Sequence, residues 1–359
     1  MGAEPVRICL VGAGRAGLVH GRNFVQFIPD ARLVAVVDAV EESRAAAARE
    51  LGVECHFGSL TEALNAVEFD AVCIATPTYT HRDLAVEAAR ARKHIFCEKP
   101  MAISVEDALD IIKAVQRSGV FFQMGFMRRF DEEFLEARAH VESGRIGEVM
   151  FIRSTTRGPG LPPPWAWETA KSNGMLAEVN SHDFDTVRWL TGSEYRLVFA
   201  RAKARKAREV LQKHRDFYDV AVVSVEMESE ALGVVDGACP VEYGYDARVE
   251  VLGTEGVVTV GAIPQGTVVR CTKDGQVIAH AFRSWRDRHR SGYLEEDRHF
   301  VRCIRTGEPP RVTALDGLRA LEAVLAARTS LLSGQPVEVS HSSLQPAEPA
   351  QGEPRPGGG

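Results

Sequence analysis

The stretch VRICLVGAGRAG, residues 6–17, decides the fold of this chain. A run of apolar, β-type residues leads directly into Gly12, Gly14 and Gly17, which have the G-x-G-x-x-G spacing. The pattern is specific here because it follows a predicted strand, opens a predicted helix, and is followed about 20 residues later by an acidic residue, Asp38. These features predict a dinucleotide-binding turn. Gly12 allows the tight turn, Gly14 lets the backbone approach a pyrophosphate, and the helix N-terminus faces the phosphates.

The residue at the end of the second predicted strand indicates which dinucleotide is bound. Asp38 can accept hydrogen bonds from a ribose 2′-hydroxyl and would repel a 2′-phosphate, so the sequence favours NAD over NADP. NADP is the alternative cofactor, because the flexible Arg15 side chain could bind its 2′-phosphate. A tight glycine turn without a ligand is the alternative to a cofactor site. The residues of the loop that we expect to hold the cofactor are Gly12, Ala13, Gly14, Arg15, Ala16 and Gly17.

Strand and helix signals alternate over the first third of the chain. Further continuous apolar runs are RLVAVVDA (32–39), FDAVCIATP (69–77), KHIFCEKP (93–100) and VFFQMGF (120–126). Helical segments rich in Ala, Glu and Arg lie between them: EESRAAAAREL (41–51), THRDLAVEAARAR (80–92) and SVEDALDIIKAVQRSG (104–119). Buried strands joined by helices predict an α/β domain of the Rossmann type, a doubly wound parallel sheet, over residues 1–125.

The remainder of the chain has a different pattern. We expect a helix in EEFLEARAHVESG (132–144), a strand in EVMFIRSTTR (148–157), a proline-rich loop, GPGLPPPWAW (158–167), and one helix near 174–191. Strands dominate residues 196–282, with a hairpin over 248–262, and two helices near 292–306 and 313–333 close the pattern. This predicts a second α/β domain over 126–335 with an open, mostly antiparallel sheet. The Pro/Gly/Glu-rich tail, 340–359, is predicted to be disordered.

Composition excludes several classes of partner. The chain has 359 residues, a net charge of −6 and 45% hydrophobic residues, so we expect no nucleic-acid or membrane partner. The densest basic stretch, RAKARKAR (201–208), is interpreted as a solvated edge strand or loop. Seven dispersed cysteines without C-x-x-C predict reduced, buried thiols in a cytoplasmic protein, and no His/Cys spacing indicates a metal site. No signal peptide is expected, because a strand begins within a few residues of the N-terminus.

A charged pair stands at the end of the strand in residues 93–100. Glu98 and Lys99 are followed by Pro100, which has no backbone donor. Ligands of doubly wound sheets bind at the carboxyl ends of the parallel strands. We therefore expect Glu98 and Lys99 to lie beside the cofactor. The alternative is a surface salt bridge followed by a proline that ends the strand.

The preceding strand ends in ATPTYTH, residues 75–81. Pro77 is expected to end the strand, and Thr76 or Thr78 to cap the next helix. Thr76, Pro77 and His81 are further candidates for contact with the cofactor. The alternative for His81 is an ordinary residue in the first turn of a helix.

Four side chains share one stripe of the helix predicted near 174–191. At about 100° per residue, Glu178, His182, Asp185 and Trp189 face the same side. Two carboxylates and an imidazole on one stripe indicate either a solvated face or a site.

The glycine fingerprint, ATPTYTH and CEKP occur in the order typical of the Gfo/Idh/MocA oxidoreductases, and the chain resembles this family over residues 6–335. The stretches MGFMRRFD, SHDFDTVRWLTG and VEYGYDARVEVLGTEG most resemble its inositol 2-dehydrogenases. The resemblance implies NAD(P)-dependent chemistry and a Rossmann domain followed by an α/β domain with an open antiparallel sheet. It also implies a homodimer or homotetramer formed through that sheet, and a catalytic Lys99 near the nicotinamide and the substrate hydroxyl.

The same resemblance assigns roles on the predicted helix. Inositol dehydrogenases have Asp-x-x-x-His followed by a second Asp three residues later; His182 and Asp185 match, while Glu178 replaces the first Asp. A neutral imidazole suits a general base near pH 7 and an ammonium stabilises a developing alkoxide. We therefore assign His182 as base, Lys99 as its electrostatic partner, and Glu178 and Asp185 as groups that orient the base or bind substrate.

Position within the family-like segments suggests further substrate contacts, each of which could instead be a salt bridge or a core aromatic. These candidates are Arg128, Arg157, Trp165, Trp167 and Tyr243. The expected function is NAD-dependent oxidation of a cyclic polyol such as an inositol. The alternatives are a sugar or amino-sugar dehydrogenase or reductase and, from another class, a regulator that senses a dinucleotide without catalysis.

Overall fold

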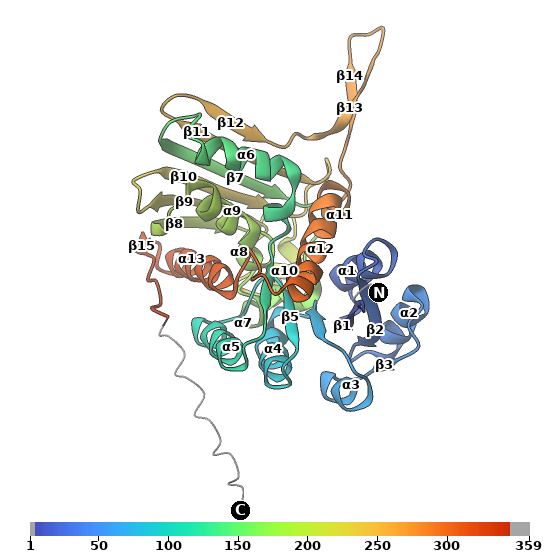
Figure 1. Ribbon diagram of the computed structural model, residues 1–359. Coiled ribbons are helices and arrows are strands. Elements are labelled where there is room, and N and C mark those ends of the chain that lie inside the picture. The colour runs from blue at the N-terminus through green and yellow to red at the C-terminus, as the bar shows by residue number, and fades with distance from the viewer. Residues whose placement is uncertain (1–3, 345–359) are drawn as a thin grey trace, which may run out of the picture.

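The computed structural model describes residues 4–344 and arranges them around two large sheets (Figure 1). The first sheet has six parallel strands in the order β3-β2-β1-β4-β5-β6, which confirms the predicted Rossmann domain. Its strands are β1 (Val6–Val11), β2 (Ala31–Val37), β3 (His56–Phe57), β4 (Ala71–Ile74), β5 (His94–Glu98) and β6 (Phe122–Gly125). The strand order reverses at β1, so the crevice for a ligand lies between the carboxyl ends of β1 and β4.

Helices cover both faces of this sheet, which is why its central strands are apolar throughout. All four residues of β4 are buried. The helices that follow the strands are α1 (Arg15–Gln26), α2 (Glu41–Leu51), α3 (Leu60–Ala66), α4 (His81–Arg90) and α5 (Val105–Ser118). Local signals set their ends: at α5, Ser104 Oγ accepts from Asp107 N at 3.1 Å, and Gly119 ends the helix at φ 69°.

The second sheet has seven strands in the order β12-β11-β7-β10-β9-β8-β15. Only β7 and β10 pair in parallel among them, so the prediction of a mostly antiparallel sheet is confirmed. These strands are β7 (Val149–Arg157), β8 (Tyr195–Lys203), β9 (Val220–Met227), β10 (Leu232–Ala238), β11 (Asp246–Gly253), β12 (Val257–Val260) and β15 (Val337–Glu338). The expected hairpin over 248–262 is β11 and β12.

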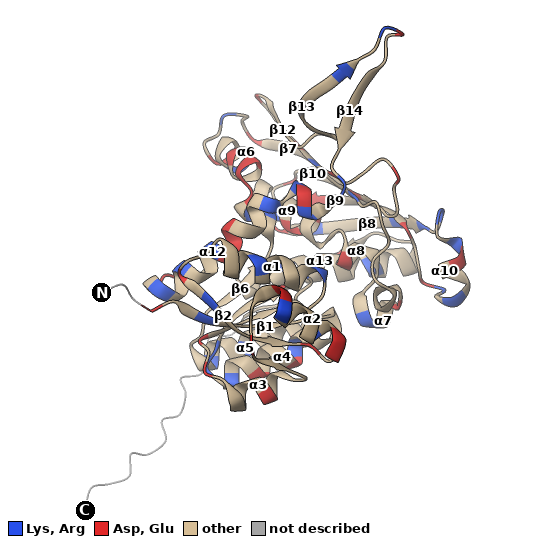
Figure 2. Ribbon diagram, turned by 90° about the vertical axis from the view of Figure 1, so that its right-hand side faces the viewer, with Lys and Arg blue, Asp and Glu red and all other residues tan. Residues whose placement is uncertain are grey.

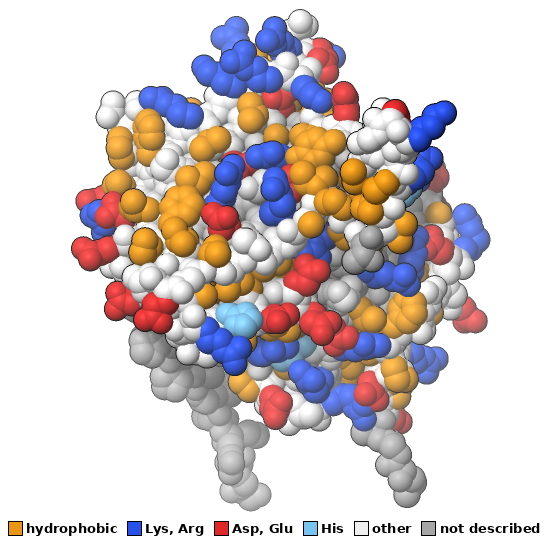
Figure 3. Space-filling model, turned by 90° about the horizontal axis from the view of Figure 1, so that it is seen from above, with side chains coloured by type: hydrophobic (Ala, Val, Ile, Leu, Met, Phe, Trp, Pro, Cys, Tyr) orange, Lys and Arg blue, Asp and Glu red, His pale blue; other side chains and the backbone are white. Residues whose placement is uncertain are grey.

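Helices α6 (Glu132–Glu142), α9 (Ser181–Thr191) and α13 (Ala314–Ser333) pack on one face of the second sheet. No helix of residues 4–344 covers the other face, and large apolar side chains on it are exposed. Figure 3 shows hydrophobic side chains interspersed with charged ones on the side of the molecule seen from above. Exposed apolar residues of these strands are Val222, Leu232, Leu252 and Val257.

The prediction of one helix near 174–191 is wrong. The segment forms α8 (Met175–Glu178) and α9, separated at residues 179–180. Asn180 Nδ2 donates to Asp183 Oδ2 at 2.8 Å, an alternative to continuing the helix. The same side chain packs against β10, where a Cβ added to Gly237 would lie 2.2 Å from Asn180 Oδ1. The interruption is therefore set by a contact between distant parts of the chain.

Helix α10 (Arg208–Lys213) was not predicted from the sequence, nor was the separation of two of the predicted strands into a sheet of their own. This helix interrupts the region predicted as strands, and the hairpin β13 (Pro264–Cys271) and β14 (Val277–Ala281) projects from the second sheet (Figure 1). This projection corrects the prediction that the cysteines are buried. Cys271 is exposed on β13 and Cys55 is half-buried, while the other five are buried; all seven are free thiols.

The last helices join the two sheets. Phe300 and Val301 of α12 (Arg290–Thr306) share a core with Val6 and Ile8 of the first sheet. Helix α13 packs against both α5 and the second sheet. None of the helices in residues 4–344 is long and apolar enough to cross a membrane. The tail predicted to be disordered over 340–359 lies, from residue 345 onward, outside the described residues.

Candidate active site

The glycine loop connects β1 to α1, and the absence of a Cβ has a different structural consequence at each of its three glycines. Gly12 has φ +106°, and a Cβ on it would lie 2.5 Å from Ala75 O. A Cβ on Gly17 would lie 1.9 Å from Gly12 O, so the helix could not approach the loop. A Cβ on Gly14 would meet no described atom within 4 Å. Gly14 therefore leaves open space at the N-terminus of α1, and this space fits a pyrophosphate.

Asp38 lies directly after β2 and is tied to the glycine loop. Its Oδ2 accepts from Ala13 N at 2.8 Å and its Oδ1 accepts from Val40 N at 2.9 Å. The carboxylate is thereby held in place and keeps lone pairs for ribose hydroxyls. Arg44 Nη1 donates to Asp38 O at 3.3 Å, and Arg15 is exposed. The loop and Asp38 together fit NAD.

The charged pair at the end of β5 is not a pair of side chains bound to each other. Glu98 Oε2 accepts from the backbone N of Lys99 at 2.9 Å, and Glu98 Oε1 lies 3.1 Å from His20 Nε2. The Lys99 ammonium donates instead to Glu178 O, at 2.7 Å, at the end of α8. The turn at Lys99 thus links the carboxyl edge of the first sheet to the region that follows this sheet in the chain.

A buried network lies behind this turn. His20 Nδ1 is 2.8 Å from Asp297 Oδ1, and Asn23 Nδ2 donates to Asp297 Oδ2 at 2.8 Å. Burial lowers the pKa of His20, but Asp297 and Glu98 raise it more, so the net pKa is well above the usual 6.5. Burial raises the pKa of Glu296 well above its usual value, and neither of its carboxyl oxygens has a partner in residues 4–344.

Three groups of this network are close enough to consider a metal. Ligand atoms of His20, Glu98 and Glu296 lie within 4.8 Å of one another. Both nitrogens of His20 already face carboxylates, so a metal bound there would displace one of these contacts. The hydrogen bonds of His20 and Glu98 account for these two residues as an anchor for the Lys99 turn.

Glu178 is the last residue of α8, facing the end of β4. Its Oε1 accepts from Thr78 Oγ1 at 2.7 Å, so the prediction that Thr78 caps a helix is wrong. Neither does Thr76 cap one; its hydroxyl accepts from Thr80 Oγ1 at 2.7 Å. Burial raises the pKa of Glu178 to about 7, although Lys99 and Thr78 act in the opposite direction.

His182 lies in the first turn of α9 and is buried. Its Nδ1 has no hydrogen-bond partner among the described residues, and its ring meets the edge of Phe126 with centroids 6.0 Å apart. Burial, and then the positive charges of Lys99 and Arg128, lower its pKa well below 6.5. The imidazole is therefore neutral near pH 7 and able to accept a proton.

His81 joins the loops that follow β4 and β5. Its Nδ1 lies 2.8 Å from Pro100 O and its Nε2 lies 2.9 Å from Thr76 O. Burial lowers the pKa of His81. The side chain thus fixes the spacing of two loops that carry candidate cofactor contacts, and both of its nitrogens are already engaged.

Two predicted substrate contacts are committed to buried ion pairs. Asp185 binds Arg129 through both oxygens, at 2.6 and 2.9 Å. Arg128 donates to Asp183 Oδ1 at 2.9 Å and to Thr156 Oγ1 at 2.6 Å. These contacts hold α9 against the second sheet and the turn after β6. Glu178 and His182, the other titratable members of the predicted stripe, form no ion pair within residues 4–344.

The remaining candidates are spread over other parts of the second region. Arg157 pairs with Asp236 at 2.7 Å, and the Tyr243 hydroxyl donates to Asp246 Oδ2 at 2.8 Å. Trp167 Nε1 donates to Pro162 O at 2.9 Å within the proline-rich loop. Trp165 meets the ring of Tyr79 with centroids 6.0 Å apart, so this loop reaches the segment after β4.

Sequence reasoning missed several residues of the site. His20 lies three residues after Gly17 in the same helix, and this spacing could have indicated a position facing the sheet. The other missed residues join the site only through tertiary structure: Thr78 donates to Glu178, Asp297 contacts His20, and Glu296 lies near Glu98.

Comparison with known proteins agrees with this geometry. The model of the oxidoreductase family with an NAD-binding Rossmann fold matches residues 6–126, and the GFO/IDH/MocA C-terminal domain matches residues 134–259. The chain is 36% identical to myo-inositol 2-dehydrogenase of Thermotoga maritima and 34% identical to scyllo-inositol 2-dehydrogenase (NAD(+)) of Bacillus subtilis. The alignments cover 91% and 93% of this chain, respectively, and 96% of each relative.

A solved structure of similar fold contains both a cofactor and a polyol. Scyllo-inositol dehydrogenase of Lactobacillus casei, with bound NAD(H) and scyllo-inositol, superposes with a TM-score of 0.86 at 29% identity. The match covers 94% of this chain and 99% of that one. The glycine loop, the Lys99 turn and the matches along the whole chain lead to one conclusion: the chain belongs to the Gfo/Idh/MocA family of NAD-dependent oxidoreductases.

Proposed function

We propose that this dehydrogenase oxidises a secondary hydroxyl of a cyclic polyol of the inositol type, with NAD as the hydride acceptor. The observation that carries the proposal is the hydrogen bond from the Lys99 ammonium to Glu178 O at the carboxyl edge of the sheet that bears the glycine loop, with His182 in the first turn of the next helix. The relatives named above as inositol dehydrogenases support the class of substrate.

Bound NAD would supply the hydride acceptor, and the glycine loop and Asp38 would hold it. The protein's own part is to manage the proton and the charge of the reacting hydroxyl. His182 is neutral and would accept the hydroxyl proton at a ring nitrogen, which makes it the general base. The Lys99 ammonium would stabilise the negative charge that develops on the oxygen.

Glu178 would orient the substrate. Its carboxyl group accepts from Thr78 through Oε1, which leaves capacity to bind a further hydroxyl of a polyol. With a pKa of about 7, the group can exist both as an acceptor-only carboxylate and as a donor. The predicted roles of Asp185, Arg128, Arg157, Trp167 and Tyr243 as substrate ligands do not enter this proposal, because their contacts described above hold the fold.

One observation favours a second candidate within the family. Glu178 stands where the inositol dehydrogenase pattern has Asp, and its side chain reaches one methylene further. A different spacing of hydroxyl groups would match this reach, so a sugar or amino-sugar dehydrogenase or reductase is the alternative substrate class. A sensor without catalysis would need neither Lys99 nor His182.

The test is turnover by the purified protein on a panel of substrates. Inositol stereoisomers, aldoses and amino sugars are each incubated with NAD or NADP, and formation of the reduced cofactor is followed by absorbance. Turnover of an inositol above that of every sugar is expected. Preferential turnover of a sugar would replace the substrate class, and tight NAD binding without turnover of any compound would favour the sensor.

The proposed assembly is a homodimer or homotetramer formed through the uncovered face of the second sheet. Exposed Val222 and Leu232 lie on adjacent strands of that face, with Arg153 and Glu226 near them. Analytical ultracentrifugation of the wild type and of Val222→Glu tests this arrangement. We expect the substitution to shift the protein towards smaller species, and an unchanged oligomer would place the interface elsewhere.

A further inference from the structure

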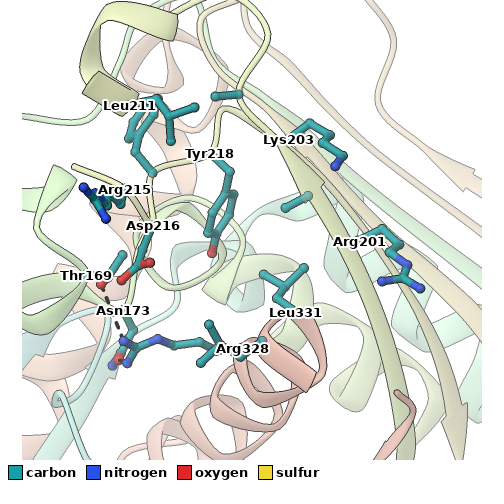
Figure 4. A pocket seen from close by; sticks show the side chains of 14 residues that line it. Thr169, Asn173, Arg201, Lys203, Leu211, Arg215, Asp216, Tyr218, Arg328 and Leu331 are labelled. Carbon is teal, nitrogen blue, oxygen red and sulfur yellow. Dashed lines mark hydrogen bonds between the residues drawn. The ribbon is translucent and has the colours of Figure 1, made fainter. Parts of the chain in front are cut away.

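A cavity of about 360 Å³ lies at the end of β8, between this strand, α10 and the C-terminal part of α13 (Figure 4). None of the residues that line it belongs to the active site described above. We propose that this cavity is a second ligand site, and that it binds a small anion with two or more negative charges on a carbon skeleton. Phosphate esters and polycarboxylates share this chemistry.

The charge of the cavity is the first argument. Four cationic side chains line it, against one carboxylate, that of Asp216. None of the four has a carboxylate within 4.0 Å among residues 4–344, whereas Arg128 and Arg129 near the active site are both paired. Unpaired positive charge around a concavity favours an anion. The four cations are Arg201, Lys203, Arg215 and Arg328.

The position of these cations within the basic stretch is the second argument. RAKARKAR was interpreted from the sequence as a solvated edge strand or loop. In the structure Arg201 and Lys203, two residues apart on β8, both line the cavity, whereas Arg205 and Lys206 lie beyond it. Figure 2 shows, as blue segments of the ribbon, that Lys and Arg positions are concentrated at the end of β8 and around α10. The stretch therefore contributes two of its five cations to the cavity, while Arg205, Lys206 and Arg208 lie outside it.

Two donors at the inner end of the cavity are already positioned. Arg328 Nη1 donates to Asn173 Oδ1 at 2.9 Å, which fixes one side of its planar guanidinium. The Tyr218 hydroxyl accepts from Leu176 N at 3.3 Å and donates to no described residue. A fixed guanidinium and an unused hydroxyl proton suit the oxygens of a phosphate or carboxylate. Figure 4 shows both side chains from the cavity side.

The lining also explains why a bare inorganic ion would not fill the site. Leu211 and Leu331 line the same cavity as the cations. An apolar wall beside a cluster of donors matches a ligand with a carbon body and a charged end.

The cavity is connected to the catalytic carboxylate through α8. Tyr218 contacts the first turn of this helix at Leu176, and Glu178 ends the same helix. Asn173, which binds Arg328, precedes it. We therefore expect an occupied cavity to change the KM for the reducing substrate more than the KM for NAD.

The experiment measures anion binding to the protein saturated with NAD, so that the glycine loop does not compete. Citrate, a polycarboxylate, and propyl phosphate, a phosphate ester, are titrated by calorimetry at constant ionic strength, with inorganic phosphate for comparison. Arg201→Gln/Lys203→Gln removes two cavity cations, and Arg205→Gln/Lys206→Gln is the matched control from the same stretch. Circular dichroism and thermal melting without ligand establish that both variants fold.

We expect saturable binding of citrate or propyl phosphate, weakened at least about tenfold by the cavity variant and less than about twofold by the control. Inorganic phosphate should bind more weakly than either. Absence of saturable binding, or equal weakening by the two variants, would overturn the proposal. If the cavity variant does not fold, Arg215→Gln tested alone must weaken binding, and an unchanged affinity would equally overturn it.

Discussion

The ammonium of Lys99, at the end of the first sheet's fifth strand, donates a hydrogen bond to the backbone carbonyl of Glu178 at 2.7 Å. This contact joins the Rossmann sheet to the segment that precedes α9. The groups that we propose for catalysis therefore come from the Rossmann sheet and from the region that follows it, and neither region alone contains the proposed proton acceptor and the cofactor loop together. The positions of Lys99 and Glu178 depend on each other.

Removing the ammonium should reduce turnover while leaving the fold intact. For Lys99→Met we expect kcat to fall about 10²- to 10³-fold, because a charge that stabilises the reacting oxygen is lost. NAD affinity, measured by fluorescence titration, should change little. Lys93→Met is the matched control, since Lys93 also donates to a backbone carbonyl, Phe69 O at 2.8 Å, but away from the site. Equal kcat in the two variants would contradict a catalytic role for Lys99.

Replacing the imidazole tests the proposed base. His182→Gln should lower kcat about 10²- to 10⁴-fold, the usual contribution of a general base, with NAD binding retained. His140→Gln, on the surface of α6, should have no effect. Steady-state kinetics with the best substrate of the panel measures both. If His182→Gln keeps wild-type turnover, another group must take the proton.

The architecture could be predicted because its signals are local. The glycine spacing, Asp38 and the alternation of apolar strands with helices lie within short windows of sequence, and they predicted the first, parallel sheet correctly. The hairpin at 248–262 followed from a Gly-containing turn between two β-rich arms. In each case the residues that determine the element are neighbours in the chain.

The site was less predictable because its contacts join distant residues. Glu178 and His182 were assigned to one helix, but the helix breaks where Asn180 packs against Gly237, 57 positions away. Helical periodicity carries no information about such a contact. The same limit explains Asp185, whose partner Arg129 lies in another segment, and His20, whose role depends on Asp297. Only the resemblance to a family placed Lys99 near these groups.

The raised pKa of Glu178 predicts a pH-dependent stability. Burial disfavours its carboxylate, so the folded state holds the proton up to a pKa of about 7, above the ordinary value of 4.5. This stabilisation is complete below about pH 4.5 and is lost as the pH rises through about 7. Relative to Glu178→Gln, the wild type should therefore become less stable over this interval. Urea unfolding at several pH values measures the difference, and a constant difference would contradict the raised pKa.

Asp38 should determine the preference for NAD over NADP. In Asp38→Asn the charge that would repel a 2′-phosphate is absent, while the side chain still accepts a backbone hydrogen bond. We expect weaker NAD binding and stronger NADP binding, shifting the ratio of dissociation constants at least about tenfold. Asp30→Asn, at an exposed position before β2, is the control. An unaltered ratio would mean that the ribose is bound by other residues.

Loss of His20 should destabilise the whole protein, because it leaves buried carboxylates without their partner. His20→Gln is expected to lower the free energy of unfolding by about 3–5 kcal/mol, the range for breaking a buried ion pair. Because Asp297 and Glu98 raise the pKa of His20 above 6.5, the pair's stabilisation is complete below pH 6.5 and declines as the pH rises through the higher folded value. The deficit of His20→Gln should therefore be larger at pH 6 than well above the folded pKa. Denaturant unfolding at both pH values tests this, with His214→Gln as an outlying control. A small deficit that does not vary with pH would mean that His20 is uncharged and that Glu98 is held by its bond to Lys99 N alone.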